Sequence, residues 1–97
     1  MDVYRAIADP TRRLLMDELV KRDDQTLFEL CTRLLTEHGV DSSRQAISQH
    51  LDTLESVGLI SSRRDGRYKF HRLHTEPLSE IHERWPVRRE EEHRRSI

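Results

Sequence analysis

The sequence contains one cysteine, Cys31, and only three glycines. A single cysteine excludes an internal disulfide, and three glycines are too few for the phosphate-cradling loops of nucleotide-binding enzymes. Neither a nucleophile–base pair nor a set of four metal ligands is recognisable, so we expect no enzymatic activity. A signal peptide and a long apolar run are also missing, which predicts a soluble, cytoplasmic protein without a membrane span.

Apolar and aromatic residues are scarce as well. Five aromatic residues and a hydrophobic fraction of 34% predict a thin core in a chain of 97 residues. A domain of this size buries only about two-thirds of its unfolded surface, and such a protein often gains stability by pairing with a copy of itself. We therefore expect one small dimerising domain over residues 1–85, followed by a charged tail over residues 86–97.

The whole chain has no large excess of either positive or negative charge, but positive charge is concentrated in one segment. The formal net charge is −1, yet residues 42–72 carry six Lys and Arg against three Asp and Glu, a local net charge of +3. Residues 1–41 carry six Lys and Arg against nine Asp and Glu, and residues 73–97 carry five Lys and Arg against six Asp and Glu. A local basic face is the electrostatic footprint of a protein that binds nucleic acid, although an ordinary mixed surface would explain the same numbers.

Capping signals and apolar spacing divide the chain into helices. Asp9 and Pro10 start one helix, Thr26 and Glu29 form a capping box that starts another, and Gly39 closes it. Thr75 is the expected cap of the last helix, which Pro86 ends. The expected elements are helices over residues 2–8, 10–22, 27–38, 43–57 and 75–85, with a hairpin over residues 60–73.

The start of the fourth helix is less sharply defined. The turn over residues 36–41 is longer than in a tight helix-turn-helix, so either Ser42 or Ser43 is the cap, and Ser42 with Gln45 repeats the capping-box spacing. Gly58 ends this helix, and the dipeptide Asp65-Gly66 predicts the turn of the hairpin.

The apolar spacing also predicts which side chains are buried. Helix 10–22 should bury Leu14, Leu15, Leu19, Met16 and Val20, and the next helix Leu27, Leu30, Cys31, Leu34 and Leu35. Ile47, Leu51, Leu54 and Val57 form the stripe of the fourth helix, and Tyr68 and Phe70 should point inward from the hairpin. The fold class is therefore mainly α (α+β): a winged helix-turn-helix of about five helices with a two-stranded β-hairpin wing.

The outward face of the fourth helix is suited to reading DNA. Arginine can fork onto guanine, glutamine can pair with adenine, and serine allows close approach to a base or phosphate. The candidate DNA-binding residues of this helix are Ser43, Arg44, Gln45, Ser48, Gln49 and His50. Alternatively, they are ordinary polar surface residues. For His50, beside the apolar stripe, a half-buried, hydrogen-bonded packing role is favoured over base reading.

Four cations surround the tip of the hairpin, where a wing would lie along a phosphate backbone: Arg63, Arg64, Arg67 and Lys69. The alternative is a solvated edge ribbon protected from aggregation by its charge.

Four segments carry a resemblance to a known family: IADPTRRLLMDEL, FELCTRL, SRQAISQHLDTLESVGLI and RRDGRYKFHRL. In order and spacing, from about Val3 to Leu78, they resemble the ArsR-type winged-helix repressors. The resemblance implies a homodimer that binds a palindromic operator in double-stranded DNA and represses transcription. The sequence does not tell whether an inducer exists. The resemblance also implies an interface between the first and last helices, formed by Val3, Tyr4, Ile7, Leu78, Ile81 and Trp85.

Many members of that family sense metals, but the ligand patterns are broken here. Cys31 occupies the first position of a Cys-x-Cys pair whose second position is Arg33, and a lone thiolate beside a cation is a poor site for a thiophilic metal. For the family's second metal site, which uses the final helix, Lys69 in the hairpin and Trp85 fall where acidic ligands should be. We therefore expect no metal and no cofactor. The alternatives are a metal-sensing repressor and a winged-helix protein-interaction module without DNA affinity.

Overall fold

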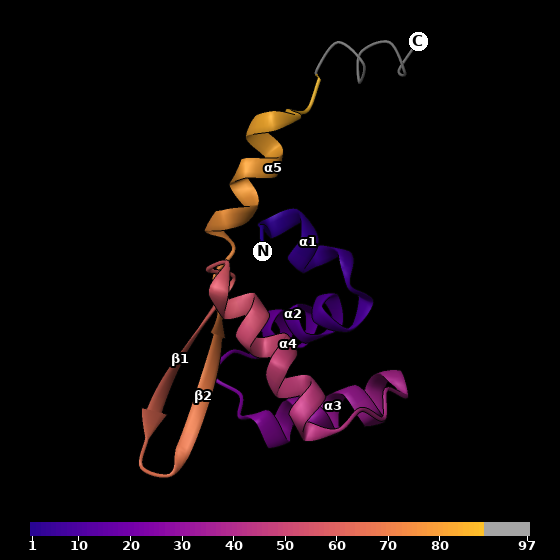
Figure 1. Cartoon of the computed structure of the whole chain (residues 1–97), viewed down its shortest axis with the longest axis vertical. Coiled ribbons are helices and arrows are strands. Elements are labelled where there is room, and N and C mark those ends of the chain that lie inside the picture. The colour runs from indigo at the N-terminus through magenta and orange to yellow at the C-terminus, as the bar shows by residue number, and fades with distance from the viewer. Residues whose placement is uncertain (89–97) are drawn as a thin grey trace.

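The computed structural model describes residues 1–88, which form five α-helices, a short 3-10 helix and one antiparallel hairpin (Figure 1). The elements are α1 (Val3–Ala8), α2 (Pro10–Lys21), α3 (Leu27–His38), α4 (Arg44–Ser56), β1 (Ile60–Asp65), β2 (Tyr68–Leu73), η1 (Glu76–Leu78) and α5 (Ser79–Arg84). This is the winged helix-turn-helix expected from the sequence. Most of the expected charged tail, residues 89–97, lies outside the described residues.

Local capping chemistry sets the helix starts. Asp9 accepts a hydrogen bond from the Arg12 amide at 3.1 Å, with proline at the first helical position. Thr26 and Glu29 form the expected capping box at the start of α3, and Gly39 closes α3 with a φ of 66°. These three predictions are confirmed because each depends on residues only a few positions apart.

The core lies where α2, α3 and α4 meet the base of the hairpin (Figure 1). Its buried apolar residues are Val3, Ala6, Leu15, Leu19, Leu30, Leu34, Ile47, Leu51, Leu54, Leu59 and Ile60. Val20 and Leu35 are exposed, so their expected burial is wrong. Each follows a buried leucine by one position, and one residue turns an α-helix by about 100°, away from the core.

The hairpin pairs Ile60 with Leu73 and, at its tip, Asp65 with Tyr68. The two turn residues are Gly66, with a φ of 65°, and Arg67. The turn therefore lies one residue beyond the predicted Asp65-Gly66.

The face of β2 that packs on the helices is the opposite of the one expected. His71 is 4% exposed, whereas Tyr68 is 57% exposed and Phe70 is half-buried. Alternation along a strand defines two faces but not which one turns inward. The Nδ1 atom and the amide of His71 both lie 2.9 Å from the Gln25 carbonyl oxygen, and these hydrogen bonds allow the imidazole to be buried in place of an aromatic ring.

The chain after the hairpin starts with η1 rather than directly with an α-helix. Thr75 precedes η1 without a side-chain capping bond, so the expected cap is wrong. Its backbone is helical rather than extended, and an N-capping side chain requires the extended form. The following helix, α5, ends at Arg84, just before Trp85 and Pro86, and buries none of its residues. It extends away from the body at the end opposite to the wing tip (Figure 1).

Candidate nucleic-acid interface

The cap and the first two turns of α4 carry the residues of this helix that are predicted to read DNA. Ser43 is the cap, because its hydroxyl accepts a hydrogen bond from the Ala46 amide at 3.0 Å. The expected capping box of Ser42 with Gln45 is not formed, since Ser43 takes the capping position. Burial of Ile47, Leu51 and Leu54 turns the opposite face outward, and Arg44, Gln45 and Gln49 are exposed there, with Ser48 half-buried.

His50 lies on the flank of α4 and contacts Arg12 of α2. Its Nδ1 atom is 3.2 Å from the Arg12 guanidinium, which also donates to the carbonyl oxygens of Ala6 and Arg5. A guanidinium only donates hydrogen bonds, so His50 accepts through Nδ1. The contact gives His50 a packing role that joins α4 to α1 and α2, and direct reading of a base by His50 stays a prediction.

The cations of the wing differ in whether a nearby carboxylate holds them. Arg63 lies 3.8 Å from a carboxylate oxygen of Asp24, and its guanidinium lies 4.9 Å from the centre of the Phe70 ring. Arg64, Arg67 and Lys69 have no carboxylate within 4.0 Å among residues 1–88. These three cations are therefore available for phosphates, whereas Arg63 would have to leave Asp24.

The loop between α2 and α3 fixes the wing to the body, which the sequence did not reveal. Within this loop, Asp24 donates its amide to the carbonyl of His71 at 2.9 Å, and Asp23 accepts from the Leu73 amide at 2.8 Å. Asp24 also holds the Arg72 guanidinium at 2.7 Å, which lowers the pKa of its carboxyl. We call residues 23–25 the wing anchor. Asp24 has a φ of 60°, a conformation that aspartate tolerates better than most residues.

A buried carboxylate lies beneath the helix-turn-helix and was also missed. Glu18 of α2 is 0% exposed. Burial alone would raise its pKa, but hydrogen bonds from Lys21, His38 and Arg33 outweigh that effect and lower the pKa of Glu18 from 4.5 to about 2. The contacts are 2.8, 2.8 and 3.0 Å long. Because Arg33 and His38 belong to α3, Glu18 fixes the first helix of the motif onto α2.

The residues expected at a dimer interface lie near one another at the end of the molecule opposite to the wing tip (Figure 1). Tyr4 of α1 and Trp85 pack edge to face, with ring centres 6.0 Å apart. Trp85 is 60% exposed, and Tyr4, Ile7, Leu78 and Ile81 are half-buried. Val3 is buried within the protomer, so it supports this surface from beneath.

Metal ligands do not gather in the part of the chain that the structure describes: no group of three His, Cys, Asp or Glu side chains there could hold an ion. Cys31 is half-buried, and burial raises the pKa of its thiol. The helices formed by residues 1–88 are all too short or too polar to cross a lipid bilayer.

A helix with exposed polar side chains, followed by a hairpin whose cations Arg64, Arg67 and Lys69 have no carboxylate partner among residues 1–88, is typical of a winged helix-turn-helix DNA-binding transcriptional regulator. No family model matches the sequence. The chain is, however, 42% identical over 83 residues to the uncharacterized HTH-type transcriptional regulator YuzN of Bacillus subtilis, covering 86% of this chain and 90% of that protein. It is 35% identical over 79 residues to the transcriptional repressor SdpR of the same organism, covering 81% and 80%.

A solved structure agrees with these relatives. The ArsR-like transcriptional regulator from Rhodococcus sp. RHA1 superposes with a TM-score of 0.67 at 35% identity, covering 84% of this chain and 74% of that one. The chain therefore belongs to the ArsR-type winged helix-turn-helix family of transcriptional regulators, which are not enzymes.

Proposed function

We propose that the protein is a homodimeric, cytoplasmic repressor that binds a palindromic operator, with α4 in the major groove and the wing on the phosphate backbone. The observation that carries the proposal is that α4 and the wing present different kinds of side chain, suited to bases and to phosphates respectively. The first two turns of α4 expose an arginine and two glutamines, and three wing cations have no carboxylate within 4.0 Å among residues 1–88. The repressor role is supported by the relative named as a transcriptional repressor.

The dimensions of α4 fit this role. A helix of 13 residues is roughly 20 Å long, and the major groove of about 12 Å width admits an α-helix. Arg44, Gln45 and Gln49 would face base edges, while Ser43 and Ser48 allow the close approach of the backbone. Two copies related by a two-fold axis would place their reading helices roughly 34–36 Å apart, which matches operators with inverted half-sites.

The test compares two groups of single substitutions on an operator selected from random DNA duplexes. Replacing Arg64, Arg67 or Lys69 by alanine should weaken binding to every sequence alike and lower the salt slope by about one. Replacing Arg44, Gln45 or Gln49 should cost roughly 1–3 kcal/mol on the operator and relax preference at defined positions. Arg5→Ala, which removes an exposed cation from α1, is the control and should change neither quantity.

Two outcomes would contradict the proposal. Equal losses from both groups on operator and random DNA would show that α4 does not read bases. Failure to retain any duplex at low salt would favour the protein-interaction module. Release of DNA by zinc, cadmium or arsenite, abolished in Cys31→Ser, would instead establish metal sensing.

A further inference from the structure

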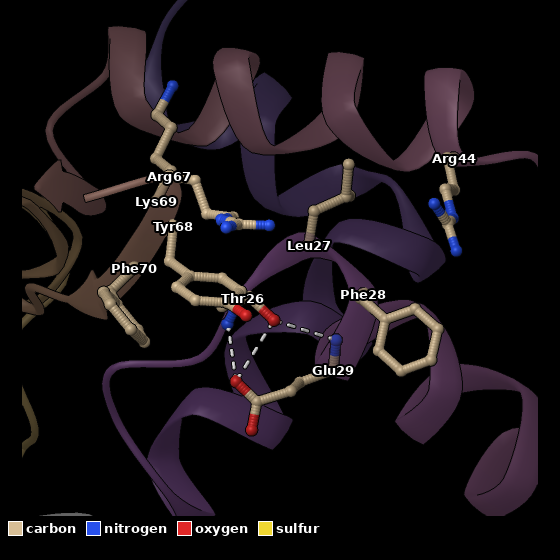
Figure 2. A pocket seen from close by; sticks show the side chains of 9 residues that line it. All are labelled: Thr26, Leu27, Phe28, Glu29, Arg44, Arg67, Tyr68, Lys69 and Phe70. Carbon is tan, nitrogen blue, oxygen red and sulfur yellow. Dashed lines mark hydrogen bonds between the residues drawn. The ribbon is translucent and has the colours of Figure 1, made fainter. Parts of the chain in front are cut away.

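A hollow of about 610 Å³ opens between the wing and the amino-terminal ends of α3 and α4 (Figure 2). Its apolar wall is formed by Leu27, Phe28, Tyr68 and Phe70, and two arginines border it, Arg44 and Arg67. Small-molecule sites commonly measure about 300–1,000 Å³ and combine apolar walls with a few polar groups. In size and composition, the hollow resembles such a site.

The aromatic rings of this wall are unusually exposed for a protein with so few of them. Phe28 is 60% exposed and Tyr68 is 57% exposed. The rings of Tyr68 and Phe70 lie 6.2 Å apart, centre to centre. Three of the five aromatic side chains therefore border one hollow and leave apolar surface in contact with water. Covering this surface with an apolar ligand would be favourable.

The charges around the hollow favour an anion. The Arg44 guanidinium lies 5.2 Å from the centre of the Phe28 ring, and Arg67 points from the wing toward α3 (Figure 2). The one lining carboxylate, Glu29, is already held by the amide of Thr26 at 3.0 Å and by Arg22. In the same view the Lys69 amine points away from the rings, which leaves Arg44 and Arg67 as the lining cations that face the hollow.

We propose that this hollow binds a small aromatic carboxylate, whose ring lies against Phe28, Leu27 and Tyr68 and whose carboxylate is held by Arg67 or Arg44. Guanidinium groups bind carboxylates through two parallel hydrogen bonds, which gives both strength and orientation. A phosphodiester would satisfy the arginines but leave the apolar wall uncovered. The combination of wall and charge therefore selects an apolar anion over a nucleic-acid backbone.

Binding of such an anion would have a consequence that rests on the proposed function. Arg44 and Arg67 are both assigned to DNA, one to a base edge and the other to a phosphate. A carboxylate that occupies these guanidinium groups withdraws them from DNA, and the ligand body fills the space between the wing and α4. The ligand is therefore an inducer that acts by direct competition at the DNA-binding surface.

Binding is tested on the full chain without DNA. The probe is 1-naphthoate, compared by isothermal titration with the neutral 1-naphthalenemethanol and with inorganic phosphate. Naphthoate should bind about tenfold or more tightly than either, because only naphthoate offers both a ring and a charge. Amide resonances of residues 26–29 and 67–70 should shift on binding. No binding of naphthoate at millimolar concentration, or equal binding of phosphate, overturns the proposal.

Matched variants locate the site. Phe28→Ala should weaken naphthoate binding about tenfold, and Leu35→Ala, which removes an exposed apolar side chain from the same helix, should not. Arg67→Gln should weaken it to a similar extent, whereas Arg64→Gln, on the wing but outside the hollow, should leave it unchanged. Circular dichroism checks that each variant is folded. Affinity that does not respond to Phe28→Ala overturns the site.

The link to DNA is measured separately. Naphthoate should release the selected operator from the natural protein and fail to release it from Phe28→Ala, which retains every proposed DNA contact. If naphthoate binds the hollow but the protein retains no DNA, only the proposed function fails. If DNA binds and naphthoate neither binds nor competes, only the ligand site fails.

Discussion

Glu18 of α2 joins that helix to α3 through two charged contacts, with Arg33 and His38. Its carboxylate is buried and accepts hydrogen bonds from Lys21, Arg33 and His38. Glu18→Gln removes the negative charge and so weakens these hydrogen bonds. The free energy of unfolding should therefore fall by about 2–4 kcal/mol, a loss limited by water, which can solvate the partly exposed cations. Chemical denaturation measures the loss. Glu37→Gln removes an exposed carboxylate 3.9 Å from the same Arg33 and should cost less than about 0.5 kcal/mol.

The lowered pKa of Glu18 also gives a pH dependence with a defined sign. In the unfolded chain this carboxyl has a pKa of 4.5, and in the folded chain about 2. Its stabilising contribution is therefore fully present above pH 4.5 and is lost as the pH falls toward 2. The difference in thermal midpoint between the natural protein and Glu18→Gln should be largest near neutral pH and shrink between about pH 5 and pH 2. A constant difference across this range would contradict the assignment.

At the scale of the element, the wing depends on an anchor outside its own hairpin. Asp24→Asn keeps a residue that tolerates a positive φ but removes the charge that holds Arg63 and Arg72. The wing should become more mobile while the helices keep their stability, so amides of β2 should exchange faster with deuterium. Asp65→Asn, at the wing tip, is the control. Unchanged exchange in Asp24→Asn would show that backbone bonds to Asp23 and Gln25 suffice to hold the wing.

The elements also show what sequence patterns can predict. The Thr26–Glu29 capping box and the Gly39 cap depend on neighbours within about one turn of helix, and the sequence contains them directly. The inward face of β2 depends on partners 46 residues away, where the Gln25 carbonyl accepts from His71. Burial of Glu18 likewise depends on cations from another helix, and hydrophobic spacing assigns a charged residue to the surface.

The candidate site follows the same division. The exposed positions Arg44, Gln45 and Gln49 follow from the apolar stripe of their own helix. The availability of Arg63 for a phosphate does not, because it depends on Asp24 in a distant loop. The hollow beside Phe28 was missed for a similar reason, since its walls come from α3, α4 and the wing.

At the scale of the whole molecule, the exposed aromatic surface at the α1 and α5 end predicts self-association. Trp85, 60% exposed, packs against Tyr4 beside the half-buried Ile81. Trp85→Arg should weaken dimerisation and operator binding together, because burying an unpaired guanidinium at an apolar interface is unfavourable. Sedimentation equilibrium at micromolar concentration measures the association. Leu35→Arg adds the same charge to α3 at the other end of the molecule and should leave the dimer intact. A stable monomer of the natural protein would remove the basis for palindromic recognition.

The wing anchor also determines at what stage of synthesis the wing can dock on the helices. Residues 23–25 lie between α2 and α3, but their partners Arg72 and Leu73 follow 48 and 50 positions later. Contacts so far apart in the chain form after local helices, because a long loop must be closed first. The helix-turn-helix can assemble from contacts within the first 56 residues. The ribosome must add β2 before the anchor gains its partners, so the proposed reading helix exists before the wing that would hold it on DNA.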